Sequence, residues 1–244
     1  MSLDPLHEEL ARLALSLPEA GPVALAGGGA MLAHGLVARP TQDLDLFTPD
    51  PDDVVRLADA LAVALRADGA RVTIDRRDPG FARMVVTMPD GRAVAVEVAH
   101  DARIRDTVRL AFGPVLHPDE VAADKTLALF GRAAARDLVD VDALQHRYTR
   151  DQLFALAAEK DPGFDPGVFA DALAAAARHS DAAFAELGLD AAATVSLRAR
   201  ADQWRRELRP EPGPTLGASR DRTARGYPGS TTPTTRDEPP SLSR

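Results

Sequence analysis

The chain has 244 residues, and its 45% hydrophobic content is ample for a buried core. Its formal net charge of −8 argues against broad, non-specific binding of nucleic acid, although a local basic patch could still bind one. The lack of cysteine excludes disulfides and thiolate metal sites. No apolar run approaches the roughly 20 residues of a membrane helix, and the N-terminus lacks signal-peptide features. We therefore expect a cytoplasmic protein that does not enter a membrane.

The spacing of apolar residues predicts the elements of the first half of the chain. Helices are expected at residues 6–17, 29–36 and 51–69, and strands at residues 23–26, 44–47, 71–75, 82–88 and 93–99. Pro89, Asp90 and Gly91 join the last two strands, which is typical of a hairpin turn.

The second half is predicted to be helical from Pro118 onward. After Leu208 the composition shifts to proline, glycine, serine, threonine and arginine, which is typical of disorder. We therefore expect an α+β (mixed α/β) fold: a core with a mixed sheet at residues 1–116, a helical C-terminal lobe at residues 117–208 and a disordered tail at residues 209–244.

The segment most indicative of chemistry follows the first strand. Gly27, Gly28 and Gly29 would allow the backbone to approach a phosphate without a side chain in the way. Asp43 and Asp45 alternate with apolar residues on the next strand, so their carboxylates project from one face. Two carboxylates this close repel each other unless a cation lies between them, and Mg²⁺ prefers oxygen ligands of this kind.

These features together resemble the signature of the polymerase β-like nucleotidyltransferases, in which an apolar strand, a Gly-Gly pair and a short helix precede Asp-x-Asp on the next strand. The run RPTQDLDLF, from Arg39 to Phe47, looks like the AbiEii/AbiGii toxin branch, which includes MenT-like proteins and carries R-x-S/T-x-D-L-D-L-F. The resemblance implies that Arg39, Thr41 and the three glycines bind the nucleotide. Gly29 departs from the branch, which usually carries a hydroxyl residue at that position.

A third carboxylate is expected from the strand at residues 93–99. Glu97 is the single acid within this apolar strand, and a buried carboxylate is unfavourable unless it is paired or bound to metal. The polymerase β-like pattern includes a third acid on a strand beside Asp-x-Asp, and Glu97 is the candidate. The alternative is an edge strand on which Glu97 faces water.

The chain uses arginine for almost all of its 29 basic residues, and its only two lysines, Lys125 and Lys160, both lie in the helical region from residue 118. AbiEii-type proteins carry K-x-x-A-L-x-x-R followed by R-D and a further acid, which resembles the runs KTLALFGR and RDLVD here. The resemblance implies that Lys125 contacts phosphate and that Asp140 or Asp137 is required for catalysis, as a base or an orienting group. An unbroken helix would place Asp140 beside Lys125, unless Gly131 breaks it.

The resemblance thus implies a Mg²⁺-dependent enzyme that moves NMP from an NTP to an acceptor, with Asp43, Asp45 and Glu97 as ligands of two Mg²⁺ ions. It further implies the toxin of a type IV toxin–antitoxin system with a cognate antitoxin, and MenT-like relatives modify the 3′ end of tRNA. Two alternatives remain. One is a transferase that acts on a small molecule, as the aminoglycoside-modifying enzymes do, or on a protein, and the other is a catalytically inert nucleotide-binding module.

Overall fold

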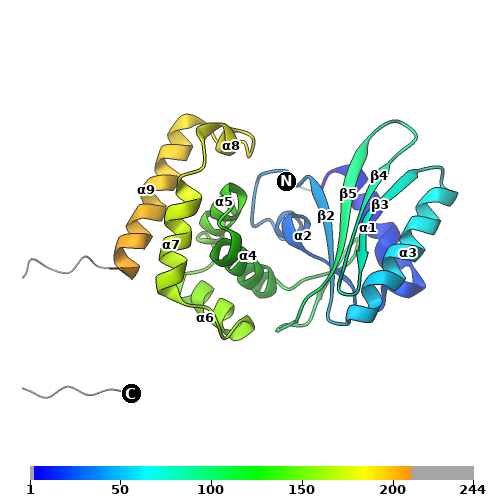
Figure 1. Cartoon of the computed structure of the whole chain (residues 1–244), viewed down its shortest axis with the longest axis horizontal. Coiled ribbons are helices and arrows are strands. Elements are labelled where there is room, and N and C mark those ends of the chain that lie inside the picture. The colour runs from blue at the N-terminus through cyan, green and yellow to red at the C-terminus, as the bar shows by residue number, and fades with distance from the viewer. Residues whose placement is uncertain (1–2, 210–244) are drawn as a thin grey trace, which may run out of the picture. The chain divides into compact units, whose positions relative to one another are not determined.

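A seven-stranded mixed sheet organises the computed structural model, which describes residues 3–209 (Figure 1). The strands lie in the order β3-β4-β5-β2-β1-β7-β6. Their bounds are Ala24–Leu25 (β1), Asp43–Thr48 (β2), Arg71–Asp78 (β3), Phe81–Thr87 (β4), Ala93–His100 (β5), Val108–Leu110 (β6) and Gly113–Val115 (β7). Strand β2 runs parallel to β5, and β1 runs parallel to β7, whereas the other neighbours are antiparallel. The predicted mixed α/β class is therefore confirmed.

Helices precede, interrupt and follow the sheet. Their bounds are Pro5–Ser16 (α1), Gly27–Ala33 (α2), Pro51–Ala67 (α3), Pro118–Arg132 (α4), Ala135–Leu144 (α5), Arg150–Lys160 (α6), Pro166–Ala177 (α7), Asp181–Ala185 (α8) and Ala191–Leu208 (α9). A proline opens α1, α3, α4 and α7, where its missing N–H breaks no helical hydrogen bond. None of the helices in residues 3–209 has the length and apolar character to cross a membrane.

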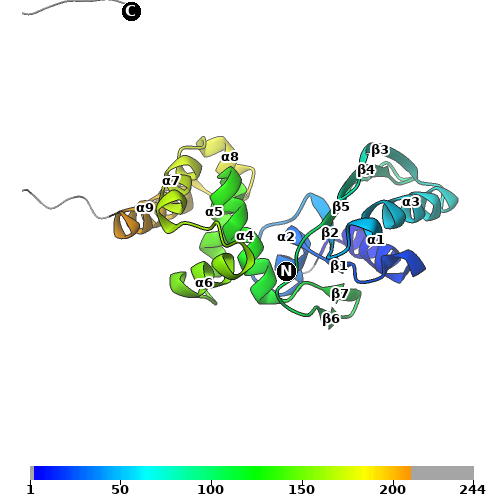
Figure 2. The same cartoon turned by 60° about the horizontal axis from the view of Figure 1, so that its bottom comes forward.

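The two faces of the sheet have different surroundings. Leu44 and Leu46 of β2 are buried in register with Val96 and Val98 of β5, on the face that α1 and α3 cover (Figures 1 and 2). Each such side chain contributes about 1.5–3 kcal/mol through burial. The alternate residues of the same strands point to the opposite face, which looks toward α2 and α4. The apolar core thus fixes which face presents the polar residues.

The helical region after β7 is held together by aromatic rings. Phe154 of α6 packs against Phe169 of α7 with ring centroids 5.0 Å apart, and against Phe164 at 5.2 Å. Phe130 of α4 lies 5.2 Å from Phe164, and Trp204 of α9 lies 6.5 Å from Phe154. These contacts anchor α4, the helix that carries Lys125, to the helices that follow it.

The chain is helical from Pro118 as predicted, but the assumption of one unbroken helix is wrong, because α4 and α5 are separate helices. Helix α4 ends at Arg132, and Ala133 adopts a left-handed conformation with φ of 50°. Asp137 then accepts a hydrogen bond from the Ala134 N–H at 3.1 Å, which caps α5. The break lies two residues beyond Gly131, and the helical phase calculated through it is therefore not valid. The tail expected at residues 209–244 lies outside the described residues except for Arg209.

Candidate active site

Three carboxylates meet on the open face of the sheet. In the parallel pairing of β2 with β5, Asp45 stands opposite Glu97, and Asp43 is two positions away on the same face. Neighbouring strands lie about 4.8 Å apart, so side chains in register on one face are adjacent. Strand β5 lies between β2 and β4 in the interior of the sheet, so the alternative of an edge strand for Glu97 is wrong.

A glycine corner lies against these acids. Gly27 has φ of +54°, and a Cβ atom added there would lie 1.8 Å from Asp45 Oδ2. A Cβ atom on Gly28 would lie 2.5 Å from Thr41 Oγ1, so no larger residue fits at either position without movement. Gly29 instead faces Leu25 in the core. Gly27 and Gly28, but not Gly29, line the cavity described below.

Two cations share one buried aspartate on the other side of the site. Arg39 donates two hydrogen bonds to Asp140, at 2.8 and 2.7 Å, and Lys125 Nζ lies 2.9 Å from Asp140 Oδ2. Burial raises the pKa of the Asp140 carboxyl, but Lys125 and Arg39 outweigh that effect and leave its pKa below the ordinary value. Asp140 therefore stays ionised and holds both cations in place.

Asp137 has a different role from Asp140. It is fully buried, it accepts two hydrogen bonds from Arg132 at 2.9 and 2.7 Å, and it caps α5. It does not line the cavity. The sequence did not decide which of the two aspartates lies beside Lys125. The structure shows that Asp140 contacts Lys125, whereas Asp137 fixes the junction between α4 and α5.

The three sheet carboxylates repel one another. Burial raises the pKa of Asp45, Asp43 adds to that increase, and Lys125 opposes it. Burial also raises the pKa of Glu97, together with repulsion from Asp45, while Arg83 opposes the increase through a 2.5 Å hydrogen bond. Carboxylate oxygens are the donors that a hard divalent cation such as Mg²⁺ prefers. In the part of the chain that the structure describes, these three acids do not bring their oxygens within 4.8 Å of one another, so a bound ion would draw them closer together. Because Gly27 has no Cβ atom, the Asp45 carboxylate lies directly against its backbone.

These elements enclose a cavity of about 340 Å³, which is within the range of small-molecule sites. It is lined by residues of α2, the segment before β2, β2, β5, α4, α5, α6 and the region after α8. Those that the sequence predicted are Gly27, Gly28, Arg39, Thr41, Asp43, Asp45, Glu97 and Lys125. The structure brings these residues together, and it places Asp140 behind Lys125.

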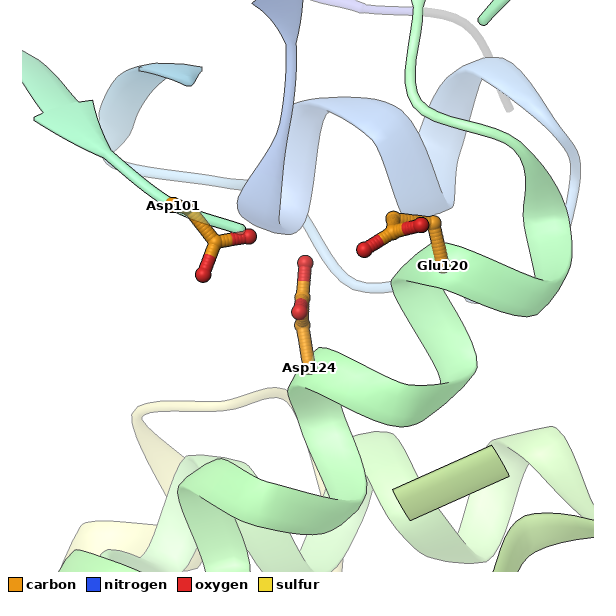
Figure 3. A group of neighbouring side chains, drawn as sticks. All are labelled: Asp101, Glu120 and Asp124. Atoms are coloured by element: carbon orange, nitrogen blue, oxygen red, sulfur yellow. The ribbon is translucent and has the colours of Figure 1, made fainter. Parts of the chain in front are cut away.

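A second acidic cluster beside the cavity was missed by the sequence prediction. Asp101, Glu120 and Asp124 point toward one another, with the last two on successive turns of α4 (Figure 3). Their spacing could hold a metal ion, but the ammonium group of Lys160 lies 2.5 Å from Asp101 and 2.6 Å from Glu120, and it also hydrogen-bonds Asp124. Lys160 thus supplies the cation at this cluster. The rarity of lysine in the sequence was the one feature that could have drawn attention to Lys160 and its acidic partners.

Comparisons with known proteins find a matching sequence family and solved structures of similar fold. The sequence model described as "Nucleotidyl transferase AbiEii toxin, Type IV TA system" matches residues 10–225. The fold is similar to that of MenT4, a nucleotidyltransferase toxin from Mycobacterium tuberculosis H37Rv, with 20% identity, a TM-score of 0.55, and 83% of this chain and 90% of that one covered. It is also similar to JHP933 from Helicobacter pylori, with 19% identity, a TM-score of 0.52, and coverage of 85% and 95%. No curated protein matches the sequence.

Proposed function

Because this chain belongs to the AbiEii family of nucleotidyltransferase toxins, we propose that it moves a nucleoside monophosphate from an NTP to an acceptor hydroxyl with the help of Mg²⁺. The observation that carries this proposal is the register of β2 with β5, which sets Asp45 beside Glu97 on the face that carries Asp43. A type IV system also implies an antitoxin partner.

Asp43, Asp45 and Glu97 would hold two Mg²⁺ ions. When bound, these ions neutralise phosphate oxygens and lower the pKa of the attacking hydroxyl. Gly27 and Gly28 line the cavity and present backbone without a side chain, so the triphosphate would approach them closely.

The cationic side of the cavity would bind the triphosphate. Lys125 offers its ammonium group to the phosphates, and Arg39 supplies a second positive charge nearby. Asp140 acts as a positioning residue for both of them rather than as a base, because its carboxylate oxygens are already bound to cations and its pKa is lowered.

The acceptor that we propose is the 3′-terminal hydroxyl of tRNA, as in the MenT-like relatives that the sequence resembles. Arg132 lines the cavity with about half of its side chain exposed, and it would face a polyanionic acceptor. This local positive charge would offset the net charge of −8.

The test is to incubate the purified protein with each α-labelled NTP, Mg²⁺ and either total RNA or total protein. We expect label on tRNA, with pyrophosphate released, and no label with Asp43→Ala. Label on protein or on a small molecule would overturn the tRNA assignment. Mg²⁺-dependent NTP binding without any transfer would identify an inert nucleotide-binding module instead.

A further inference from the structure

The cations that line the cavity differ in how they are held. Five such side chains are present among the described residues: Arg39, Lys125, Arg132, Arg136 and Lys160. Four of them pair with a fully buried carboxylate at 2.9 Å or less. Within residues 3–209, Arg136 is the exception, because it donates no hydrogen bond. Its guanidinium group therefore keeps all of its hydrogen-bond donors free of partners within the described residues.

Arg136 lies next to the metal-binding acids. Its Nη1 atom is 3.7 Å from Asp43 Oδ2, which is too long for a hydrogen bond but close enough for a solvent-screened attraction between the two charges. The side chain is 48% exposed. It belongs to the first turn of α5, whose position is fixed by the Asp137 cap. The backbone of Arg136 is thus anchored while its charged end can move.

The positive charge of Arg136 acts on all three acids. It is the ion-pair partner of Asp43, which shares one face of the sheet with Asp45 and Glu97. A divalent cation held by the same carboxylates would neutralise the negative charge that Arg136 now partly neutralises. It would also repel the guanidinium group. The two cations are therefore expected to compete.

We propose that Arg136 is the counter-ion of the metal-free site, which leaves Asp43 when a divalent cation binds and then contacts a phosphate of the bound triphosphate. This inference rests on the proposed transfer function. A planar guanidinium group that is already inside the cavity suits a phosphate group, because it can donate two parallel hydrogen bonds.

The proposal predicts two opposite effects of Arg136→Gln. Mn²⁺, used as a spectroscopic probe in the absence of nucleotide, should bind more tightly, with Kd lowered on the order of tenfold, because a competing charge is removed. In contrast, kcat/KM for transfer should fall by roughly 100-fold, because a contact to phosphate is lost. Arg136→Lys should keep the wild-type Mn²⁺ affinity and part of the activity.

Arg132→Gln is the matched control, since Arg132 also lines the cavity but is held by Asp137. It should reduce thermal stability without tightening Mn²⁺ binding. Unchanged or weaker Mn²⁺ binding by a folded Arg136→Gln variant would overturn the counter-ion role, and unchanged kcat/KM would overturn the phosphate contact. If the wild-type protein transfers no nucleotide, the proposed function fails, whereas the Mn²⁺ comparison still decides the counter-ion role.

Discussion

At the scale of single residues, the carboxylates of the site repel one another, and a bound cation would reduce this repulsion. Asp45 and Glu97 are adjacent, both have a raised pKa, and burial is the main cause in each case. Lys125 and Lys160, in contrast, are buried against carboxylates that neutralise them. The unbalanced charge is therefore concentrated on the sheet acids, where we propose that metal binds.

Asp45→Asn should stabilise the metal-free protein while it abolishes transfer. The pKa of Asp45 is raised in the folded state, so the protein loses stability as the pH rises through the unfolded value of 3.8 and then through the folded one. A neutral side chain removes this loss, so Tm in EDTA at neutral pH should rise above that of the wild type. A lower Tm, or retained transfer, would contradict the assignment.

Asp140→Asn should act in the opposite direction. Removal of this buried partner leaves Lys125 and Arg39 uncompensated, which destabilises the fold by about 3–5 kcal/mol. The folded-state pKa of Asp140 lies below the unfolded value of 3.8. Its stabilising effect is thus complete above pH 3.8 and disappears as the pH falls through the folded-state pKa.

Kinetics separate the two roles that Asp140 could have. A positioning residue predicts that Asp140→Asn raises KM for NTP and leaves the shape of the pH–rate profile unchanged across the neutral range. Loss of one limb of that profile in the variant, compared with the wild type, would instead show that Asp140 is a general base.

At the scale of elements, the break between α4 and α5 shapes the cavity. Ala133 has a positive φ, which costs a non-glycine residue about 1–2 kcal/mol. The break allows Arg132 to turn back to Asp137 and sets Arg136 toward Asp43. An unbroken helix would continue the roughly 100° rotation per residue that the sequence analysis assumed. It would have no left-handed turn to redirect the chain before α5.

Ala133→Gly should therefore stabilise the protein by about 0.5–1 kcal/mol, because glycine adopts the left-handed conformation without strain. Ala134→Gly is the matched control, since φ there is −73° and glycine offers no relief. Chemical denaturation of the two variants provides the comparison. Destabilisation by both substitutions to the same extent would argue against strain at Ala133.

At the scale of the whole molecule, the sequence predicted the helices and strands better than the contacts between residues far apart in the chain. An alternating pattern located β2, an apolar run located β5, and the glycines marked the first turn of α2. The short strands β6 and β7 were not predicted, because three residues are too few to show a pattern.

The adjacency of Asp45 and Glu97 followed only from family resemblance, because periodicity gives the face of a strand but not its neighbour in the sheet. The break before α5 lay among alanines, which are strong helix formers. The Lys160 cluster joins residues 101, 120, 124 and 160, and no local pattern links positions so far apart.

The central claim is that acids from two parallel strands hold divalent ions beneath an NTP. Anomalous diffraction from crystals grown with Mn²⁺ and a non-hydrolysable NTP analogue tests it most directly. We predict manganese peaks bounded by Asp43, Asp45 and Glu97, with the triphosphate over Gly27. Manganese only between Asp101, Glu120 and Asp124, with the sheet acids empty, would contradict the account.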